Sequence, residues 1–465
     1  MKHIYLILFF TMTLLPNTNA QNLGKILHDS HEIYLEKTIT KRRFGYQTLV
    51  NRIDELKKNS IFEVSIATKS TEGRDIYLIK CGTGKTKVML WSQMHGDEPT
   101  ATMALADIFN FLENKKDSVK REINPILDNL REELLKKCTF YFVPMLNPDG
   151  AEVWTRYTTL GIDMNRDALA LQTPEGQLLK QLIFDIKPDF GFNLHDKNRR
   201  YSAGQSGNLA TMSFLATAYN QAEEINHTRK RAMQVIVGMN QAVQTYIPKA
   251  VGRWMSDFEP RAFGDNIQKW GTTLILIESG GYKNDPEKQY IRKLNFVSIL
   301  TGLQMIASKS YKKQSIKEYQ ELPLNSKSIY DLIIRNVTIK KGETTFKADI
   351  AINRNERPVS GKDYFTNSSV IEEIGDMSVF FGTDEIEATD MEIVSEKEIG
   401  LGSKADFQIV KEGKVIYTIK NGLLCPAITH PGDPVENSHA IVGSLDIYNK
   451  IPMSFKLDPL IARLT

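Results

Sequence analysis

Short apolar segments alternate with longer amphipathic ones between about residues 33 and 311, and this alternation constrains the fold most strongly. Apolar runs of about four to eight residues are typical of buried strands, and apolar residues repeating at helical spacing are typical of helices that cover a sheet. Strands that alternate with helices predict an α/β architecture, in which helices pack on the faces of one central sheet.

The individual elements of this region follow from the same pattern. We predict strands at Phe62–Ala67, Ile76–Cys81, Lys87–Ser92, Thr139–Pro144, Asp189–Leu194 and Thr273–Glu278. We predict helices at Tyr46–Lys57, Thr100–Asn114, Ile126–Lys136, Pro174–Ile186, Thr228–Gln244 and Glu287–Lys309. Thr173 is expected to cap the helix at Pro174, because a threonine oxygen accepts free N–H groups of a first helical turn.

A second unit is predicted at the C-terminus. The chain has 465 residues, which is more than one hydrophobic core usually supports. The helical periodicity stops around residues 319–328, and short β-like runs separated by turns follow from Tyr330. We therefore predict one domain over residues 21–322 and a C-terminal β domain over residues 323–465.

Residues 1–20 have the pattern of a secretory signal. Lys2 and His3 precede the apolar run Ile4–Leu15, and Ala20 lies before Gln21. The run is shorter than the ~20 apolar residues of a membrane-spanning helix, and no other segment has that length. We expect a mature protein that begins at Gln21 and is exported to the periplasm or the extracellular space, without stable membrane insertion.

Charge and cysteine content exclude several classes of partner and framework. The 59 basic and 56 acidic residues give a formal net charge of +3, with no long basic tract and hence no footprint for nucleic acid. Cys81, Cys138 and Cys425 are too few and too scattered for a disulfide framework. Buried free thiols are the expected state of Cys81 and Cys138.

Side chains that bind metals fall where predicted strands end. His95 and Glu98 follow one strand, and His195 follows the apolar part of another. Two imidazoles and one carboxylate are the protein ligands of a catalytic zinc, which keeps a fourth position open for water. An isolated HxxE pair is common by chance, so His195 is what makes the set specific. We predict that His95, Glu98 and His195 bind the metal.

Glu278 lies in an otherwise apolar strand, where a carboxylate is costly to bury unless it is paired or functional. We predict that it acts as a general base toward water at the metal, and a structural salt bridge is the alternative. Arg156 is suited to stabilise a developing oxyanion.

The segment Asp163-Met164-Asn165-Arg166 is suited to bind a carboxylate. The guanidinium of Arg166 can donate two parallel hydrogen bonds to it, and the adjacent Asn165 amide can donate to the same oxygens. Asp163 is suited to accept the free N–H of a ligand histidine and so fix its tautomer. The alternative is an ordinary turn that carries a solvated charge.

In this order the residues resemble the zinc metallocarboxypeptidases of the carboxypeptidase A type, over roughly residues 40–310. The positions that match the family's motifs are the zinc ligands His95, Glu98 and His195, the oxyanion arginine Arg156, the carboxylate clamp Asn165 and Arg166, the supporting Asp163 and the catalytic Glu278. The resemblance implies a mixed central sheet flanked by helices and one zinc ion per chain. It also implies hydrolysis of the C-terminal bond of peptides with a free C-terminal carboxylate.

Other interpretations stay open. The segment His95-Gly96-Asp97-Glu98-Pro99 also resembles deacylases of the aspartoacylase and succinylglutamate desuccinylase group, so a zinc amidase acting on acyl-amino acids or cell-wall peptides is the alternative. A silent peptide-binding protein is a third possibility, although binding alone does not require Glu278. The region from Tyr330 faintly resembles the small β-sandwich of amidohydrolases, which implies a non-catalytic β-sandwich-like domain.

Overall fold

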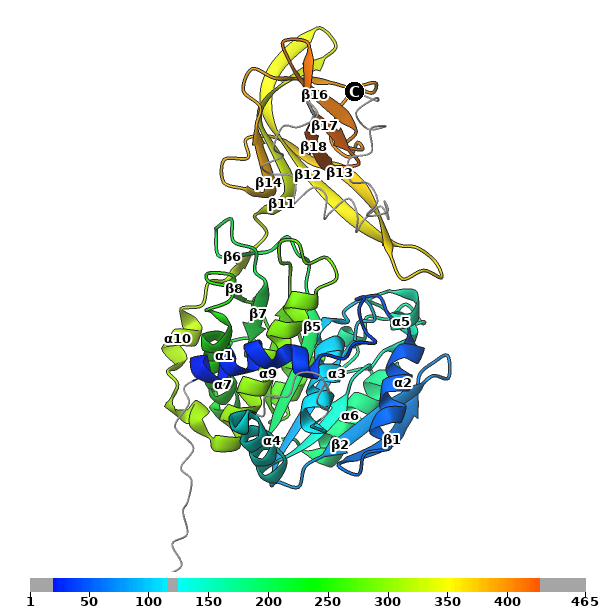
Figure 1. Cartoon of the computed structure of the whole chain (residues 1–465), viewed down its shortest axis with the longest axis vertical. Coiled ribbons are helices and arrows are strands. Elements are labelled where there is room, and N and C mark those ends of the chain that lie inside the picture. The colour runs from blue at the N-terminus through cyan, green and yellow to red at the C-terminus, as the bar shows by residue number, and fades with distance from the viewer. Residues whose placement is uncertain (1–19, 115–123, 427–465) are drawn as a thin grey trace, which may run out of the picture.

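A computed structural model describes residues 20–114 and 124–426, which form an α/β unit followed by a β unit (Figure 1). The last helix of the α/β unit, α10 (Ile316–Gln320), precedes the short strand β10 (Asn325–Ser326), and the long strands of the β unit follow. Residues 1–19 of the signal-like segment lie outside the described residues. Export therefore stays an expectation from the sequence.

The α/β unit is built on one mixed sheet of eight strands in the order β1-β2-β4-β3-β5-β9-β7-β8. The strands are β1 (Phe62–Lys69), β2 (Asp75–Cys81), β3 (Thr86–Ser92), β4 (Cys138–Val143), β5 (Phe190–Asp196), β7 (Met212–Leu215), β8 (Val251–Arg253) and β9 (Thr273–Ser279). The four central strands β4, β3, β5 and β9 are parallel, and β2 and β7 run antiparallel to them on either side. The predicted mixed central sheet is confirmed.

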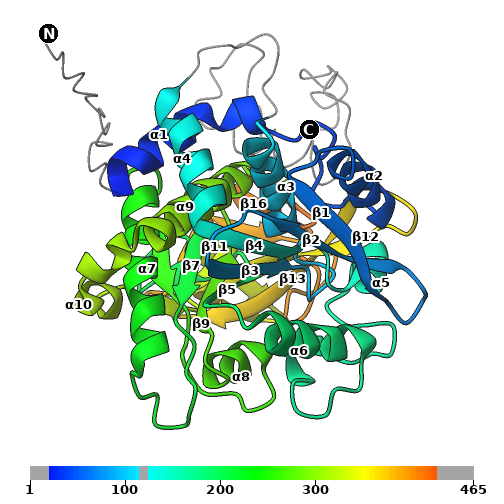
Figure 2. The ribbon, with the colours of Figure 1, turned by 90° about the horizontal axis from the view of Figure 1, so that it is seen from below.

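Helices cover both faces of this sheet (Figure 2). They are α1 (Ala20–Tyr34), α2 (Tyr46–Leu56), α3 (Thr100–Leu112), α4 (Pro125–Lys137), α5 (Pro148–Val153), α6 (Pro174–Ile186), α7 (His227–Val243), α8 (Phe263–Lys269) and α9 (Gln289–Ser308). The expected cap forms, since Thr173 Oγ1 accepts the N–H of Gly176 at 3.0 Å. The six predicted helices are present, whereas α1, α5, α8 and α10 were not predicted.

The side chains of β3 show how the sheet separates two cores. Val88 and Leu90 belong to the larger core, which includes residues of α1, α3, α7 and α9. Met89 and Trp91 point to the other face and belong to the smaller core, with residues of α6 and α8. Because successive strand residues face opposite ways, a strand covered on both faces is apolar throughout.

The β unit has one continuous hydrogen-bonded sheet around its own apolar core. Its strands are β11 (Ile329–Lys341), β12 (Thr344–Pro358), β13 (Phe365–Gly375), β14 (Phe381–Glu387), β15 (Glu392–Val394), β16 (Phe407–Lys411), β17 (Lys414–Lys420) and β18 (Leu423–Pro426). Strand β11 pairs with β12 along one edge and with both β14 and β15 along the other. The predicted C-terminal β region is confirmed, and its strands share one sheet rather than two separate ones.

Two further observations concern the chain as a whole. Cys81, Cys138 and Cys425 are free thiols, and the first two are buried as expected. Burial raises the pKa of the Cys138 thiol to about 12, so this thiol stays protonated at neutral pH. Among residues 20–114 and 124–426, no helix has the length and apolarity that crossing a bilayer requires.

A buried ionic cluster attaches α1 to the helices on the same face. The carboxylate of Asp107 in α3 binds Arg292 Nε of α9 at 2.7 Å and His31 Nε2 of α1 at 2.9 Å. It also accepts the backbone N–H of Glu36 at 2.7 Å. The side chains of Asp107 and Arg292 are both fully buried, so each charge is stabilised by the opposite charge of the other.

Replacing Asp107 by Asn is therefore expected to lower the free energy of unfolding by about 3–5 kcal/mol, because Arg292 stays buried without its counter-charge. Urea denaturation measures the change. Asp54→Asn is the matched control, since Asp54 pairs with Lys57 on the surface and its loss is expected to change stability by less than about 1 kcal/mol. Equal stability of the two variants would contradict the prediction.

Candidate active site

The central strands bring the predicted metal ligands and Glu278 to one edge of the sheet. His95 lies three residues after the end of β3, and His195 lies near the end of β5. Strands β5 and β9 pair in a register that places His195 directly beside Glu278. The carboxyl ends of parallel strands are where ligands bind in α/β folds, and the predicted residues gather at this edge.

A close contact between two turns sets the position of His95. A Cβ atom at Gly96 would lie only 2.0 Å from the carbonyl carbon of Gly150, so the turn after β3 requires glycine. Asn147 supports the same contact: its side chain accepts the N–H of Gly150 at 2.9 Å and caps α5. Asn147 therefore shapes the turn that carries His95.

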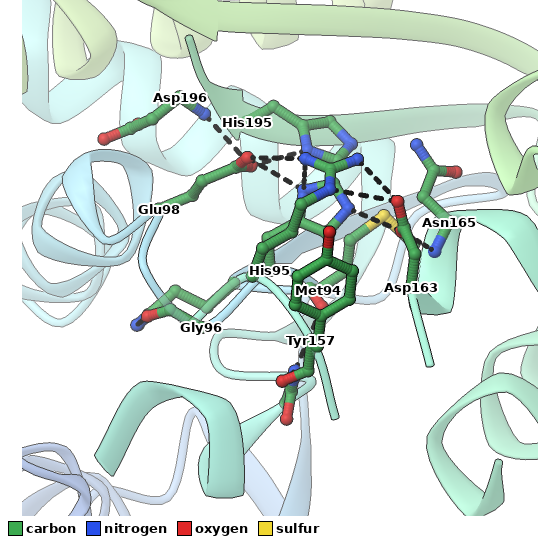
Figure 3. A network of polar contacts seen from close by, with 12 residues as sticks. Met94, His95, Gly96, Glu98, Tyr157, Asp163, Asn165, His195 and Asp196 are labelled. Atoms are coloured by element: carbon green, nitrogen blue, oxygen red, sulfur yellow. Dashed lines mark hydrogen bonds and ion pairs between the residues drawn. The ribbon is translucent and has the colours of Figure 1, made fainter. Parts of the chain in front are cut away.

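The side chains of His95, Glu98 and His195 converge on one point (Figure 3). Glu98 Oε1 lies 2.8 Å from His95 Nδ1, and Glu98 Oε2 lies 2.7 Å from His195 Nδ1. One candidate ligand atom from each residue lies within 4.8 Å of the others, and all three residues are buried. Buried groups with this spacing and this donor set fit a single metal ion.

The charges in this cluster favour a cation. Burial alone would raise the pKa of Glu98, but the charges and hydrogen bonds of His95 and His195 hold it well below its usual range. Burial alone would likewise lower the pKa of His95, yet Glu98 and Asp163 raise it to about 9. The site therefore contains a buried carboxylate that stays ionised and needs positive charge beside it.

Arg156 and Asp163 lie against this cluster. The guanidinium of Arg156 binds Asp163 Oδ2 through Nε at 3.0 Å, and its Nη1 lies 3.1 Å from His95 Nδ1 and 3.4 Å from Glu98 Oε1. Asp163 Oδ1 lies 3.2 Å from His95 Nε2, the nitrogen opposite the one that faces Glu98. Asp163 therefore leaves His95 Nδ1 free to act as a ligand.

Asp163→Asn is expected to lower the affinity for zinc about 10–100-fold, because the amide does not orient His95 and hold its tautomer as the carboxylate does. Titration of the protein with zinc against a competing chelator measures this affinity. Asp167→Asn is the control, since Asp167 lies in the same segment but accepts the N–H groups of Gln172 and Thr173 instead. Unchanged zinc affinity in Asp163→Asn would exclude this supporting role.

Glu278 is buried beside a second buried charge, Lys197. Burial and the charge of Glu98 raise the pKa of Glu278 to about 8, and burial lowers the pKa of Lys197 to about 7. Lys197 Nζ donates to the main-chain oxygens of Ala210 at 2.6 Å and of Glu278 at 3.4 Å. Among the residues that the structure describes, the Glu278 carboxylate therefore forms no salt bridge with Lys197.

The predicted carboxylate clamp is already paired with a carboxylate of the chain itself. Arg166 Nε lies 3.2 Å from Glu259 Oε2, and Arg261 Nε binds the other oxygen of Glu259 at 3.1 Å. Asn165 Oδ1 accepts the backbone N–H of Phe263 at 2.9 Å, which leaves its amide nitrogen as a donor. Arg166 is thus positioned to bind a carboxylate, and in this structure its partner is the carboxylate of Glu259.

These residues line one cleft with a volume of about 880 Å³. The ligand triad, Arg156, Asn165, Arg166 and Glu278 all contribute to its walls. Asp265, at the start of α8, lines it too, and burial raises the pKa of Asp265 to about 7. The segment from Glu259 to Asp265 therefore contributes to the cleft wall, and helix α8 begins within it at Phe263.

Lys197 and Glu259 are two of the charged residues of the cleft that were not predicted. Lys197 lies two residues beyond His195, and Glu259 lies two residues before Arg261. Their proximity to predicted site residues was the only signal in the sequence. Burial of the first and the pairing of the second with Arg166 depend on the fold.

The sequence matches known proteins over part of its length. Residues 49–177 match the zinc carboxypeptidase family. Carboxypeptidase 2 of Trichophyton tonsurans is 26% identical over 228 residues, which cover 46% of this chain and 36% of that protein. Carboxypeptidase 2 of Trichophyton rubrum is 27% identical over 202 residues, 43% of this chain and 31% of that protein. The chain thus spans about a third of the length of the curated relatives it matches.

Solved structures resemble the chain more distantly. A metallo-carboxypeptidase from Burkholderia cenocepacia aligns with 58% of this chain and 70% of its own, at 15% identity and a TM-score of 0.47. The matched segment 49–177 contains His95, Glu98 and the whole Asp163–Arg166 segment. Residues 49–177 of this chain are therefore similar to the zinc carboxypeptidase family.

Proposed function

We propose that this protein is an exported zinc carboxypeptidase that hydrolyses the C-terminal bond of peptides with a free C-terminal carboxylate. One observation carries the proposal: a buried triad of metal ligands, a buried carboxylate and a carboxylate-binding arginine line the same cleft. Binding alone would require neither Glu278 nor a ligand set with an open position. One zinc ion per chain is proposed, held by His95, Glu98 and His195.

Each group of the cleft has a task in this reaction. Zinc, when bound, would supply a Lewis acid that polarises the scissile carbonyl and makes water more acidic. Glu278 takes the proton of the attacking water and returns it to the leaving nitrogen. Arg156 donates hydrogen bonds to the oxygen on which negative charge develops. Asn165 and Arg166 hold the C-terminal carboxylate, so that the last peptide bond lies beside Glu278.

The pairing of Arg166 with Glu259 implies an exchange during substrate binding. The C-terminal carboxylate of a peptide would replace the Glu259 carboxylate, which lies 3.2 Å from Arg166 Nε. Arg261 also binds Glu259, so the displaced side chain keeps a cationic partner. The exchange therefore replaces one charge-assisted contact of Arg166 by another, without leaving either carboxylate unpaired.

Mass spectrometry of a mixed library of peptides, acylated amino acids and muropeptides, incubated with the zinc-loaded protein, tests the function. Loss of single residues from free C termini is expected, together with no cleavage of peptides whose C-terminus is amidated. Cleavage confined to acyl or cell-wall amides would replace the proposal by an amidase function. The proposed export rests on residues 1–20 alone. Protein that is isolated from the cells that produce it and still carries these residues would contradict the proposed export.

A further inference from the structure

The β unit is attached to the segment that directly follows His195. Asp331 of β11 binds Arg199 Nε at 3.0 Å and Arg199 Nη2 at 2.8 Å, and Arg200 Nη1 lies 3.2 Å from its second oxygen. Burial alone would raise the pKa of Asp331, but Arg199, Arg354 and Arg200 lower it to about 2. Asp331 is thus an ionised, buried carboxylate shared between the two units.

A second contact attaches the hairpin of β12 and β13 at the other end of the cleft, where Figure 1 shows it reaching toward α5. Phe365 packs edge to face on Trp154, with ring centroids 5.0 Å apart, and the guanidinium of Arg42 lies 4.4 Å above the Phe365 ring. Arg43 Nη1 donates to the carbonyl of Val359 at 2.7 Å. The β unit is therefore held at two separate points.

Between these points the β unit contributes directly to the walls of the cleft. Asp331, Arg354, Glu356 and Asp384 line the same cavity as His95 and Glu278. A volume of about 880 Å³ lies within the range of roughly 300–1,000 Å³ that encloses small ligands. The cavity has room for a short peptide, and residues of the β unit form part of its wall.

We infer that the β unit is the outer wall of the active-site cleft and restricts hydrolysis to short peptides. This inference rests on the proposed carboxypeptidase function and adds a substrate class to it. The contacts that hold the wall are mostly polar, and units joined by such interfaces move relative to one another when the contacts are lost. Asp331 and Phe365 are thus positioning residues that determine substrate length without touching the reacting bond.

The test compares two substrates with the same three C-terminal residues: a tripeptide, and a peptide of about twelve residues that spans roughly 40 Å when extended. For the wild type, kcat/KM is expected to be higher for the tripeptide. Asp331→Asn and Phe365→Ala are each expected to raise the ratio of long to short kcat/KM at least about fivefold, the lower end of typical coupling between sites. Phe365 does not line the cleft, so Phe365→Ala should leave the tripeptide reaction unchanged.

Two control variants separate this effect from general damage to the β unit. Asp349→Asn removes a carboxylate that also binds an arginine and backbone N–H groups, but only within the β unit. Phe346→Ala removes an exposed aromatic ring of β12. Both controls should keep the wild-type ratio. Small-angle scattering is expected to show a larger radius of gyration for Asp331→Asn than for Asp349→Asn.

The outcomes are distinct. A wild type that cleaves both peptides equally, or an unchanged ratio in folded Phe365→Ala, would overturn the inference and leave the carboxypeptidase function intact. Release of no amino acid from either peptide would overturn the proposed function and the inference with it. If Asp331→Asn fails to fold, Phe365→Ala alone decides.

Discussion

Glu278→Gln is expected to lower kcat for peptide hydrolysis by about 10²–10⁴-fold, which is the usual contribution of a general base. Glutamine has nearly the same size, so the buried site should keep its packing, but the amide cannot take a proton from water. KM and zinc content should stay close to their wild-type values, because neither the ligand triad nor Arg166 is altered.

The reason for this large effect lies in the surroundings of Glu278. Burial raises its pKa to about 8, so the carboxylate binds a proton readily near neutral pH. The positive charges of Lys197 and His95 favour the ionised form that accepts this proton. Glu63→Gln, which removes an exposed carboxylate on β1, is the control and should retain full activity. Substantial activity in Glu278→Gln would assign the base to another group.

His195→Ala is expected to remove zinc from the protein and to abolish hydrolysis. The affinity for zinc should fall by more than the roughly 10–100-fold expected when a residue that only supports a metal ligand is replaced. Glu98 would also lose the imidazole at 2.7 Å that helps to keep it ionised. Metal content after dialysis, measured by mass spectrometry, gives the first readout.

Thermal unfolding gives a second readout that does not depend on activity. Zinc that binds only the folded chain raises the melting temperature of the wild type, and the shift grows with zinc concentration. His195→Ala should show little or no shift, whereas His227→Ala, which removes an exposed histidine at the start of α7, should respond as the wild type does. An equal zinc-dependent shift in His195→Ala would exclude this histidine as a ligand.

The elements that support the site could be predicted because their patterns are local. The apolar residues of β3 and β9 form uninterrupted runs, since both faces of these strands are buried, and those of β5 are interrupted only by Gly191 and Asn193. Each run ends close to a polar residue of the cleft. Strands β7 and β8, with four and three residues, were not predicted, because such short segments show no measurable periodicity.

The pairing of distant charges could not be predicted in the same way. Asp331 binds Arg199, which lies 132 residues earlier in the sequence, and Glu259 binds Arg166, which lies 93 residues earlier. Each of these residues, taken alone, has the appearance of a solvated surface charge. Only the fold shows that the β unit contributes to the cleft and that an internal carboxylate occupies the clamp.

The segment between His195 and Ala203 has a practical consequence for exchanging parts between proteins. It carries the proposed metal ligand His195, binds Asp331 through Arg199 and Arg200, and pairs with β10 through Ser202 and Ala203. A chimera that joins this α/β unit to another β unit at residues 321–328 would leave both arginines without Asp331. A functional exchange therefore has to transplant residues 197–203 together with the β unit, as one module with two segments.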